Sequence, residues 1–132
     1  MRTDMNYARL AMLGIALAAV TASASTPWHV PERGSSEREQ IMEALRTKLR
    51  SFDDSHTDTV FVVRSLCVDE RLGWLDVLPR SRDGSNQYEP TQAVLVRRKG
   101  MWQVSKLACG EEDCEAGTDA AALKRQVGSQ CT

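Results

Sequence analysis

The strongest constraint on the fold is a change in hydrophobic period near residue 59. Before it, apolar residues recur at the spacing of one helical face: Ile41, Met42, Leu45, Leu49 and Phe52. After it, β-branched residues dominate, and apolar positions follow the period of two that strands require. One amphipathic helix followed by strands in series predicts an α+β domain, with the helix packed across an antiparallel sheet.

Turn-forming residues divide the second half of the chain into four expected strands. These strands cover residues 60–68, 73–78, 93–98 and 101–108, and Pro79 is expected to end the second. Lys99 and Gly100 link the last two strands, which indicates a hairpin. Short links between consecutive strands predict an antiparallel meander.

Two helices are expected around this sheet. The long one covers residues 37–51 and begins at a capping box formed by Ser36 and Glu39. The short one covers residues 119–127 and is expected to be capped by Thr118. The predicted fold is therefore one long amphipathic helix on a four-stranded antiparallel meander, with a short C-terminal helix and two disulfides.

Residues 1–24 are expected to be a secretory signal peptide. Arg2 and Arg9 precede an apolar run over residues 10–20, and Ala22 and Ala24 form a small-x-small cleavage pattern. That run is shorter than the roughly 20 residues that a membrane-spanning helix needs. We therefore expect a periplasmic or secreted protein without stable membrane insertion after cleavage. It would consist of an extended lead-in (25–35) and a single domain (36–132).

All four cysteines lie in the expected mature part: Cys67, Cys109, Cys114 and Cys131. An even number of cysteines in a small exported chain predicts two disulfides and no metal site or other cofactor. Three pairings are open from the sequence. The preferred one joins Cys67 to Cys109 across two strands and Cys114 to Cys131 at the C-terminal tail.

The charge balance argues against nucleic acid as a partner. Without residues 1–24, the chain has 15 basic and 17 acidic side chains, a formal charge of about −2. One local basic patch surrounds the expected hairpin, and it consists of Arg97, Arg98, Lys99 and Lys106. Such a patch either steers a charged partner or keeps the hairpin edge from pairing with other chains.

Several stretches together resemble a loose group of small exported bacterial proteins of unassigned activity. These are residues 41–46 (IMEALR), residues 60–66 (VFVVRSL), Trp74, the Asp83-Gly84 turn and residues 93–104 (AVLVRRKGMWQV). The order of one helix and four strands is also similar to cystatin-like and NTF2-like folds. Because those folds host binders, inhibitors and enzymes alike, the resemblance implies a shape and leaves the activity open.

The chain offers few groups for catalysis. His29 is expected to be passive and exposed in the lead-in. His56, which lies among Asp53, Asp54 and Asp58, is expected to belong to a solvated turn. Asp76 interrupts an apolar strand, and an ion pair with Arg64 or Arg97 is the expected explanation.

The leading hypothesis is therefore a non-enzymatic binding protein whose partner is another protein of the cell envelope, in the manner of an inhibitor or an immunity-type protein. Polar loops between rigid elements are the expected contact sites. The first comprises Asp83, Asn86, Tyr88 and Glu89, and the second comprises Glu111, Glu112 and Asp113. One alternative is a small enzyme or ligand-binding protein with an NTF2-like cavity lined by Arg64, Trp74 and Asp76. The other is a structural component of the envelope.

Overall fold

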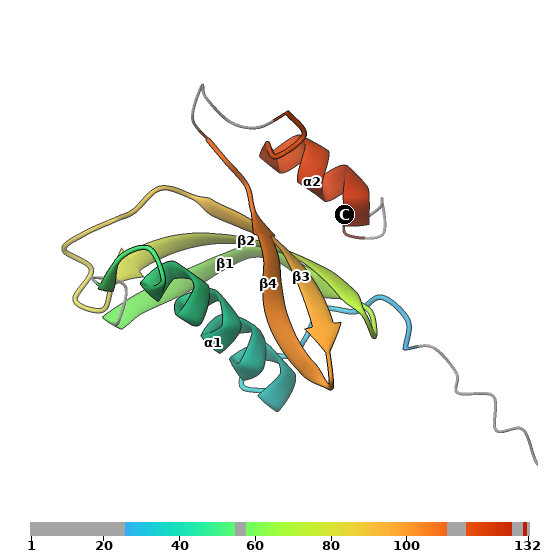
Figure 1. Ribbon diagram of the computed structural model, residues 1–132. Coiled ribbons are helices and arrows are strands. Elements are labelled where there is room, and N and C mark those ends of the chain that lie inside the picture. The colour runs from blue at the N-terminus through green and yellow to red at the C-terminus, as the bar shows by residue number, and fades with distance from the viewer. Residues whose placement is uncertain (1–25, 55–57, 111–115, 128–130, 132) are drawn as a thin grey trace, which may run out of the picture.

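The computed structural model describes residues 26–54, 58–110, 116–127 and 131, and Figure 1 shows how its elements are arranged. The chain runs through α1 (Ser36–Arg50), β1 (Thr59–Val68), β2 (Leu72–Ser81), β3 (Thr91–Arg98), β4 (Met101–Leu107) and α2 (Ala120–Val127). The four strands pair antiparallel in the order β1-β2-β3-β4. The predicted α+β meander is confirmed. The predicted signal peptide lies outside the described residues.

The long helix covers one face of the sheet, as predicted. Ile41 and Leu45 of α1 are fully buried, and Leu49 is nearly so. They pack on buried side chains that all four strands direct to this face, namely Leu66, Val68, Leu75, Val77, Ala93, Leu95 and Trp102. This α1 face is the larger of the two apolar clusters. Phe52 was expected to continue the helical stripe, but α1 ends at Arg50 and leaves Phe52 71% exposed.

The short helix covers part of the opposite face. Leu123 and Val127 of α2 pack against Trp74 of β2 and Val94 of β3. Successive residues of a strand point to opposite faces, so Trp74 and Val94 face away from their neighbours Leu75 and Leu95 in the α1 cluster. The sheet thus lies between two helices, and Figure 1 shows α1 and α2 on its two sides.

The preferred disulfide pairing is wrong, because Cys67 is bonded to Cys131, with 5.5 Å between their Cα atoms. Cys67 lies on β1 and belongs to the α2-side cluster, and α2 leads the chain back to it. Cys109 follows β4, three strands away from β1, and neighbouring strands lie about 4.8 Å apart. Cys109 is itself disulfide-bonded, while Cys114 lies outside the described residues.

Three element ends differ from the predictions. β2 continues through Pro79 to Ser81, because β3 pairs with β2 only as far as Val77 and the missing N–H of Pro79 costs no sheet hydrogen bond. The cap of α1 is Ser35, whose hydroxyl accepts from the Arg38 N–H at 3.2 Å. The cap of α2 is Asp119, whose carboxylate accepts from the Ala122 N–H at 2.9 Å. Each cap lies one residue from the position that the sequence pattern favoured.

The hairpin between β3 and β4 is confirmed as a two-residue turn. Lys99 and Gly100 both adopt positive φ, at 52° and 75°, which is the backbone shape that matches the twist of the flanking strands. The turn pairs Arg98 with Met101 and Arg97 with Trp102. Further along, the register shifts at a bulge in β4 between Val104 and Lys106.

Candidate functional site

The predicted contact loop after β2 has a defined structure. Arg80 and Gln87 form an antiparallel bridge, so the chain turns back on itself immediately beyond the sheet. The Ser81 N–H donates to the Asn86 carbonyl at 2.9 Å. The Tyr88 N–H donates to the Pro79 carbonyl at 3.0 Å. Residues 80–89 are therefore a small hairpin-like extension of β2, and we call them the β2 extension.

Asp83 is the centre of this extension. Its Oδ1 accepts from the Ser81 hydroxyl at 2.6 Å, from the Ser85 N–H at 3.0 Å and from the Ser85 hydroxyl at 2.7 Å. These donors, with the Ser81 hydroxyl contributing most, lower the pKa of Asp83 to about 2. Gly84 completes the turn at a φ of +75°. Asp83 therefore shapes the loop, and its contact with a partner stays a prediction.

The other predicted contact residues differ in their exposure to solvent, and some of them lie outside the described residues. Asn86 and Glu89 are exposed on the β2 extension, and Tyr88 is half-buried. The second predicted site, formed by Glu111, Glu112 and Asp113, lies outside the described residues.

The sequence reasoning missed an apolar groove between α1 and β4. The groove has a volume of about 420 Å³ and is lined by Gln40, Glu43, Ala44, Thr47, Lys48, Met101, Trp102, Gln103 and Val104. On α1 the lining residues recur at helical spacing next to the buried stripe, and the small side chain of Ala44 was the sequence signal that could have indicated a groove there. The groove also requires that β4 be an edge strand, and only the order of the strands shows this.

The one carboxylate that lines this groove is already neutralised. Glu43 accepts from Arg46 at 2.7 Å and from Arg50 at 2.9 Å. These bonds, the one from Arg46 above all, hold the pKa of Glu43 below its usual value.

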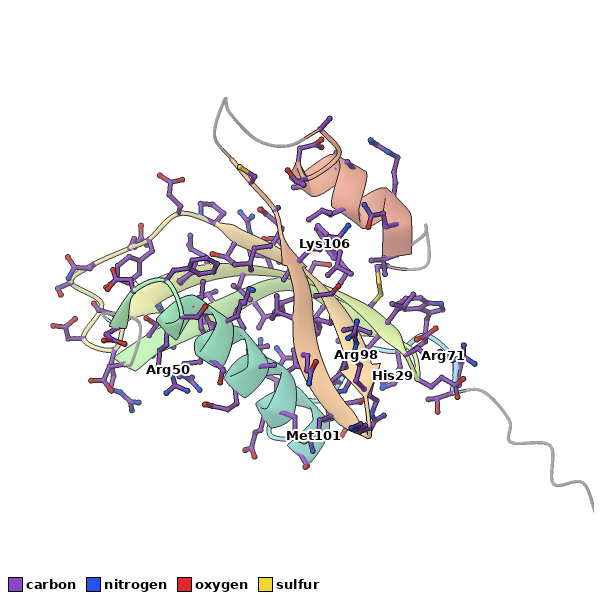
Figure 2. All side chains as sticks on the ribbon, viewed as in Figure 1. His29, Arg50, Arg71, Arg98, Met101 and Lys106 are labelled. Atoms are coloured by element: carbon purple, nitrogen blue, oxygen red, sulfur yellow. A yellow bond between two sulfur atoms is a disulfide. The ribbon has the colours of Figure 1, made fainter. Side chains whose placement is uncertain are left out.

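Three cations of the predicted basic patch, Arg98, Lys99 and Lys106, make no hydrogen bond or ion pair with any residue in the described ranges. Figure 2 shows Met101 at the tip of the hairpin and Lys106 farther along β4, towards α2.

The ion pair predicted for Asp76 is confirmed, with Arg64 as its partner. Arg64 donates through Nε at 3.0 Å and through a terminal nitrogen at 2.7 Å to the same Asp76 oxygen. A bulge in β1 at Arg64 sets this pairing. Trp74, the third residue of the alternative cavity hypothesis, is buried beneath α2 instead. Arg64 lines a cavity beside the lead-in, and neither Trp74 nor Asp76 is among the residues that line it.

His29 is half-buried and hydrogen-bonded, and its predicted placement as an exposed residue of the lead-in is wrong. Its backbone pairs with Val68 at the end of β1 through two hydrogen bonds of 2.9 Å. Its Nε2 lies 2.7 Å from a carboxylate oxygen of Glu37, and its Nδ1 lies 2.9 Å from the Pro27 carbonyl. Because both ring nitrogens face acceptors, the protonated ring is favoured, and the hydrogen bond with Glu37 is the main cause of its raised pKa.

Glu37 joins this histidine to the rest of the fold. Its second oxygen accepts from the Trp102 indole N–H at 3.3 Å and lies 3.9 Å from an Arg97 nitrogen. One carboxylate in the first turn of α1 thus connects the lead-in, the helix and the β3–β4 hairpin. We call His29, Glu37 and Trp102 the N-terminal clasp. The sequence held no signal for it, because the residues are separated by up to 73 positions.

Within the described ranges, no group of three His, Cys, Asp or Glu side chains is placed to hold a metal ion. His56, the histidine surrounded by aspartates in the sequence, lies outside those ranges. The part of the chain that the structure describes also has no helix that is both long and apolar enough to span a membrane.

Comparisons of the chain with models of protein families, with curated proteins and with solved structures find no match. The resemblance to small exported proteins therefore stays a prediction from the residues alone.

Proposed function

We propose that this protein is a non-enzymatic, exported binding protein that neutralises a protein partner acting on the cell envelope, as an inhibitor or an immunity-type protein does. The observation that carries the proposal is the β2 extension. It projects beyond the sheet and is held by an internal hydrogen-bond network on Asp83. A loop ordered before binding loses little conformational entropy in the complex, which is the main requirement of a tight inhibitor.

The extension offers suitable chemistry for a partner. Asn86 and Glu89 are exposed polar side chains, and Tyr88 provides an aromatic ring whose backbone is fixed to Pro79. Tyrosine gives a large contact area with few rotatable bonds, and it is enriched where proteins bind one another. In the proposal Tyr88 is the anchor, Asn86 and Glu89 supply specificity, and Asp83 maintains the shape of the loop.

The disulfide supports the exported location. Cys67 and Cys131 join β1 to the end of the chain beyond α2, and disulfides persist in oxidising compartments such as the periplasm. In a marginally stable small domain such a bond also stabilises the scaffold that carries the loop.

The test is partner capture from osmotic-shock fluid of the source cells, with the tagged protein immobilised and bound proteins identified by mass spectrometry. We expect one dominant partner that is retained by the wild type and lost with Tyr88→Ala. Arg125→Ala, an exposed change on α2, serves as the matched control and is expected to retain it.

Asp83→Ala is a second variant, and it tests whether the order of the loop is needed for binding. If Asp83 acts by ordering the loop, this substitution weakens capture although Tyr88 is still present. Capture that is indifferent to both substitutions would contradict the proposal. Recovery of the protein in washed envelope fractions instead of the shock fluid would favour the structural alternative.

A further inference from the structure

The second surface of interest is the free edge of β4. The strand order places β4 at the border of the sheet, with β3 on one side and no strand of the described residues on the other. The opposite border is different, because His29 pairs with Val68 at the end of β1. An edge strand with unpaired backbone groups can bind an extended chain as an additional strand.

The hairpin turn determines which backbone groups face outward. In a two-residue hairpin, the residues that flank the turn, Arg98 and Met101, form a hydrogen-bonded pair, and bonded and non-bonded pairs alternate from there. Arg97–Trp102 and Leu95–Val104 are consequently non-bonded pairs. The N–H and C=O groups of Trp102 and Val104 therefore point away from β3, and both residues line the apolar groove.

The two faces of an added strand would meet different surroundings. Trp102 and Val104 belong to the α1 side of the sheet, so alternate side chains of the added strand would enter the groove beside Ala44 and Thr47. Gln103 pairs with Val96, and Lys106 pairs with Val94 of the α2-side cluster. By the alternation of strand residues, Arg98, Gln103 and Lys106 lie on the side away from α1.

Charge disfavours a second copy of this chain as the occupant. Antiparallel pairing of two copies through Trp102 and Val104 would place Lys106 of one copy opposite Gly100 of the other, next to Lys99. Lys99 and Lys106 would thus lie near each other at both ends of the pairing, and nearby like charges repel. Arg98, Lys99 and Lys106 have no partner among the described residues, so the edge favours a chain that brings carboxylates.

We propose that the β4 edge binds an extended segment of another protein, in which apolar residues facing α1 alternate with acidic residues on the sheet face that carries Arg98 and Lys106. The segment adds a fifth strand to the sheet. The proposal rests on the proposed function only in that the chain binds proteins, and it uses a surface that is separate from the β2 extension.

The test uses the purified, disulfide-bonded protein and three labelled peptides of eight residues with blocked ends. One alternates valine with glutamate, the second alternates valine with lysine, and the third alternates serine with glutamate. Fluorescence anisotropy should show the valine–glutamate peptide binding about tenfold or more tightly than either of the others. Equal binding of the lysine peptide would overturn the assigned charge, and failure of all three would overturn the site.

Two substitutions locate the binding. Ala44→Arg fills the groove, and Ala121→Arg places the same side chain on exposed α2 as its matched control. Val104→Pro removes an outward N–H without removing a bond to β3. Both Ala44→Arg and Val104→Pro should weaken the valine–glutamate peptide about tenfold or more, and Ala121→Arg should leave its affinity unchanged. Retained binding in both groove variants would overturn the placement.

Hydrogen exchange gives a readout that does not depend on substitutions. On addition of the valine–glutamate peptide, the amides of Trp102 and Val104 should exchange at least about tenfold more slowly, because they gain hydrogen bonds. Protection spread over the β2 extension instead would contradict strand addition. A concentration-dependent dimer that Val104→Pro abolishes would show that a second copy is the occupant and would overturn the commitment to an acidic partner. Capture that is unaffected by Tyr88→Ala would overturn the proposed function and leave this inference standing, so the two failures can be told apart.

Discussion

The α1 face and the α2 face of the sheet are buried in different ways. On the α1 face, a helix of 15 residues places Ile41, Leu45 and Leu49 on seven buried strand residues. On the α2 face, a helix of 8 residues contributes only Leu123 and Val127. That face is closed by a covalent bond between Cys67 and Cys131. The comparison indicates that a short helix with a small apolar contact is retained on a sheet when the chain beyond it is tied down.

The difference follows from the cost of ordering a helix. A helix of 8 residues is unstable in isolation, and burial of two side chains contributes only a few kcal/mol. The disulfide joins residues that are 64 positions apart in the sequence, so it removes a large part of the freedom of the unfolded chain. We therefore expect the α1 face to depend on packing and the α2 face to depend on the disulfide.

Removal of the disulfide is the most severe test of the dependence of α2 on it. In the chain-entropy model, a bond that spans 64 residues stabilises the fold by about 4 kcal/mol. The double substitution Cys67→Ala and Cys131→Ala should lower the free energy of unfolding by about that amount, measured by urea denaturation. Hydrogen exchange should show α2 losing protection before α1. An unchanged order of protection would contradict the dependence of α2 on the bond.

Substitution of one buried leucine on each face allows the stability that the two helices contribute to be compared. Leu45 of α1 and Leu123 of α2 are both fully buried. Leu45→Ala should lower the free energy of global unfolding by about 3 kcal/mol, in the usual range for a buried leucine. With the disulfide intact, Leu123→Ala should instead open α2 locally, and its effect on global unfolding should be smaller. Equal effects in urea denaturation would show that the two faces unfold as one unit.

Gly73 tests how tightly the α1 face is packed. A Cβ atom at this position would lie 2.5 Å from the Val68 Cγ1 and 3.1 Å from the Cys67 carbonyl oxygen. Gly73→Ala should therefore destabilise the fold by about 2 kcal/mol through overpacking. Gly110→Ala is the control, because nothing lies within 4 Å of a Cβ placed there. Thermal unfolding of both variants measures the difference.

The smallest expected effect is the pH dependence of the N-terminal clasp. Folding raises the pKa of His29 above its ordinary value of 6.5, with the Glu37 hydrogen bond as the main cause and Asp69 as a further nearby negative charge. The clasp should therefore contribute fully below pH 6.5 and be lost as the pH rises through the folded pKa. NMR titration should place the His29 midpoint above 6.5.

The matched control for the clasp is Glu37→Gln, which keeps the shape of the side chain and removes its charge. In that variant the His29 midpoint should fall, and the loss of stability between pH 6 and pH 8.5 should shrink. A wild-type midpoint at or below 6.5 would mean that the clasp is not formed in solution.

The elements themselves could be predicted because their causes are local. The helical stripe of Ile41, Leu45 and Leu49 and the Lys99-Gly100 turn appear within a few residues of one another in the sequence. The Arg64–Asp76 pair was within reach too, since neighbouring strands of a meander bring such residues together. The candidate contacts at Asn86, Tyr88 and Glu89 stay predictions, and the hydrogen bonds that Asp83 accepts within its own loop were not predicted from the sequence.

The features that could not be predicted all join distant parts of the chain. The groove forms because α1 lies beside the edge strand β4. The N-terminal clasp joins His29 to Trp102 through Glu37. The disulfide bonds Cys67 to Cys131 rather than to Cys109. Each of these features depends on the order of the strands and on the face of the sheet to which a side chain points. A bulge such as the one at Arg64 changes the face to which the following side chains point, and the sequence pattern does not indicate where a bulge occurs.

Hydrophobic period and turn chemistry act between near neighbours, so one helix, a four-stranded meander and the hairpin could be predicted from the residues alone. Tertiary structure alone decided that α2 closes the second face, which cysteine meets Cys67, and that an apolar groove lies beside the open β4 edge. The physical reason is that these features arise from contacts between surfaces, and such surfaces exist only once the elements have packed.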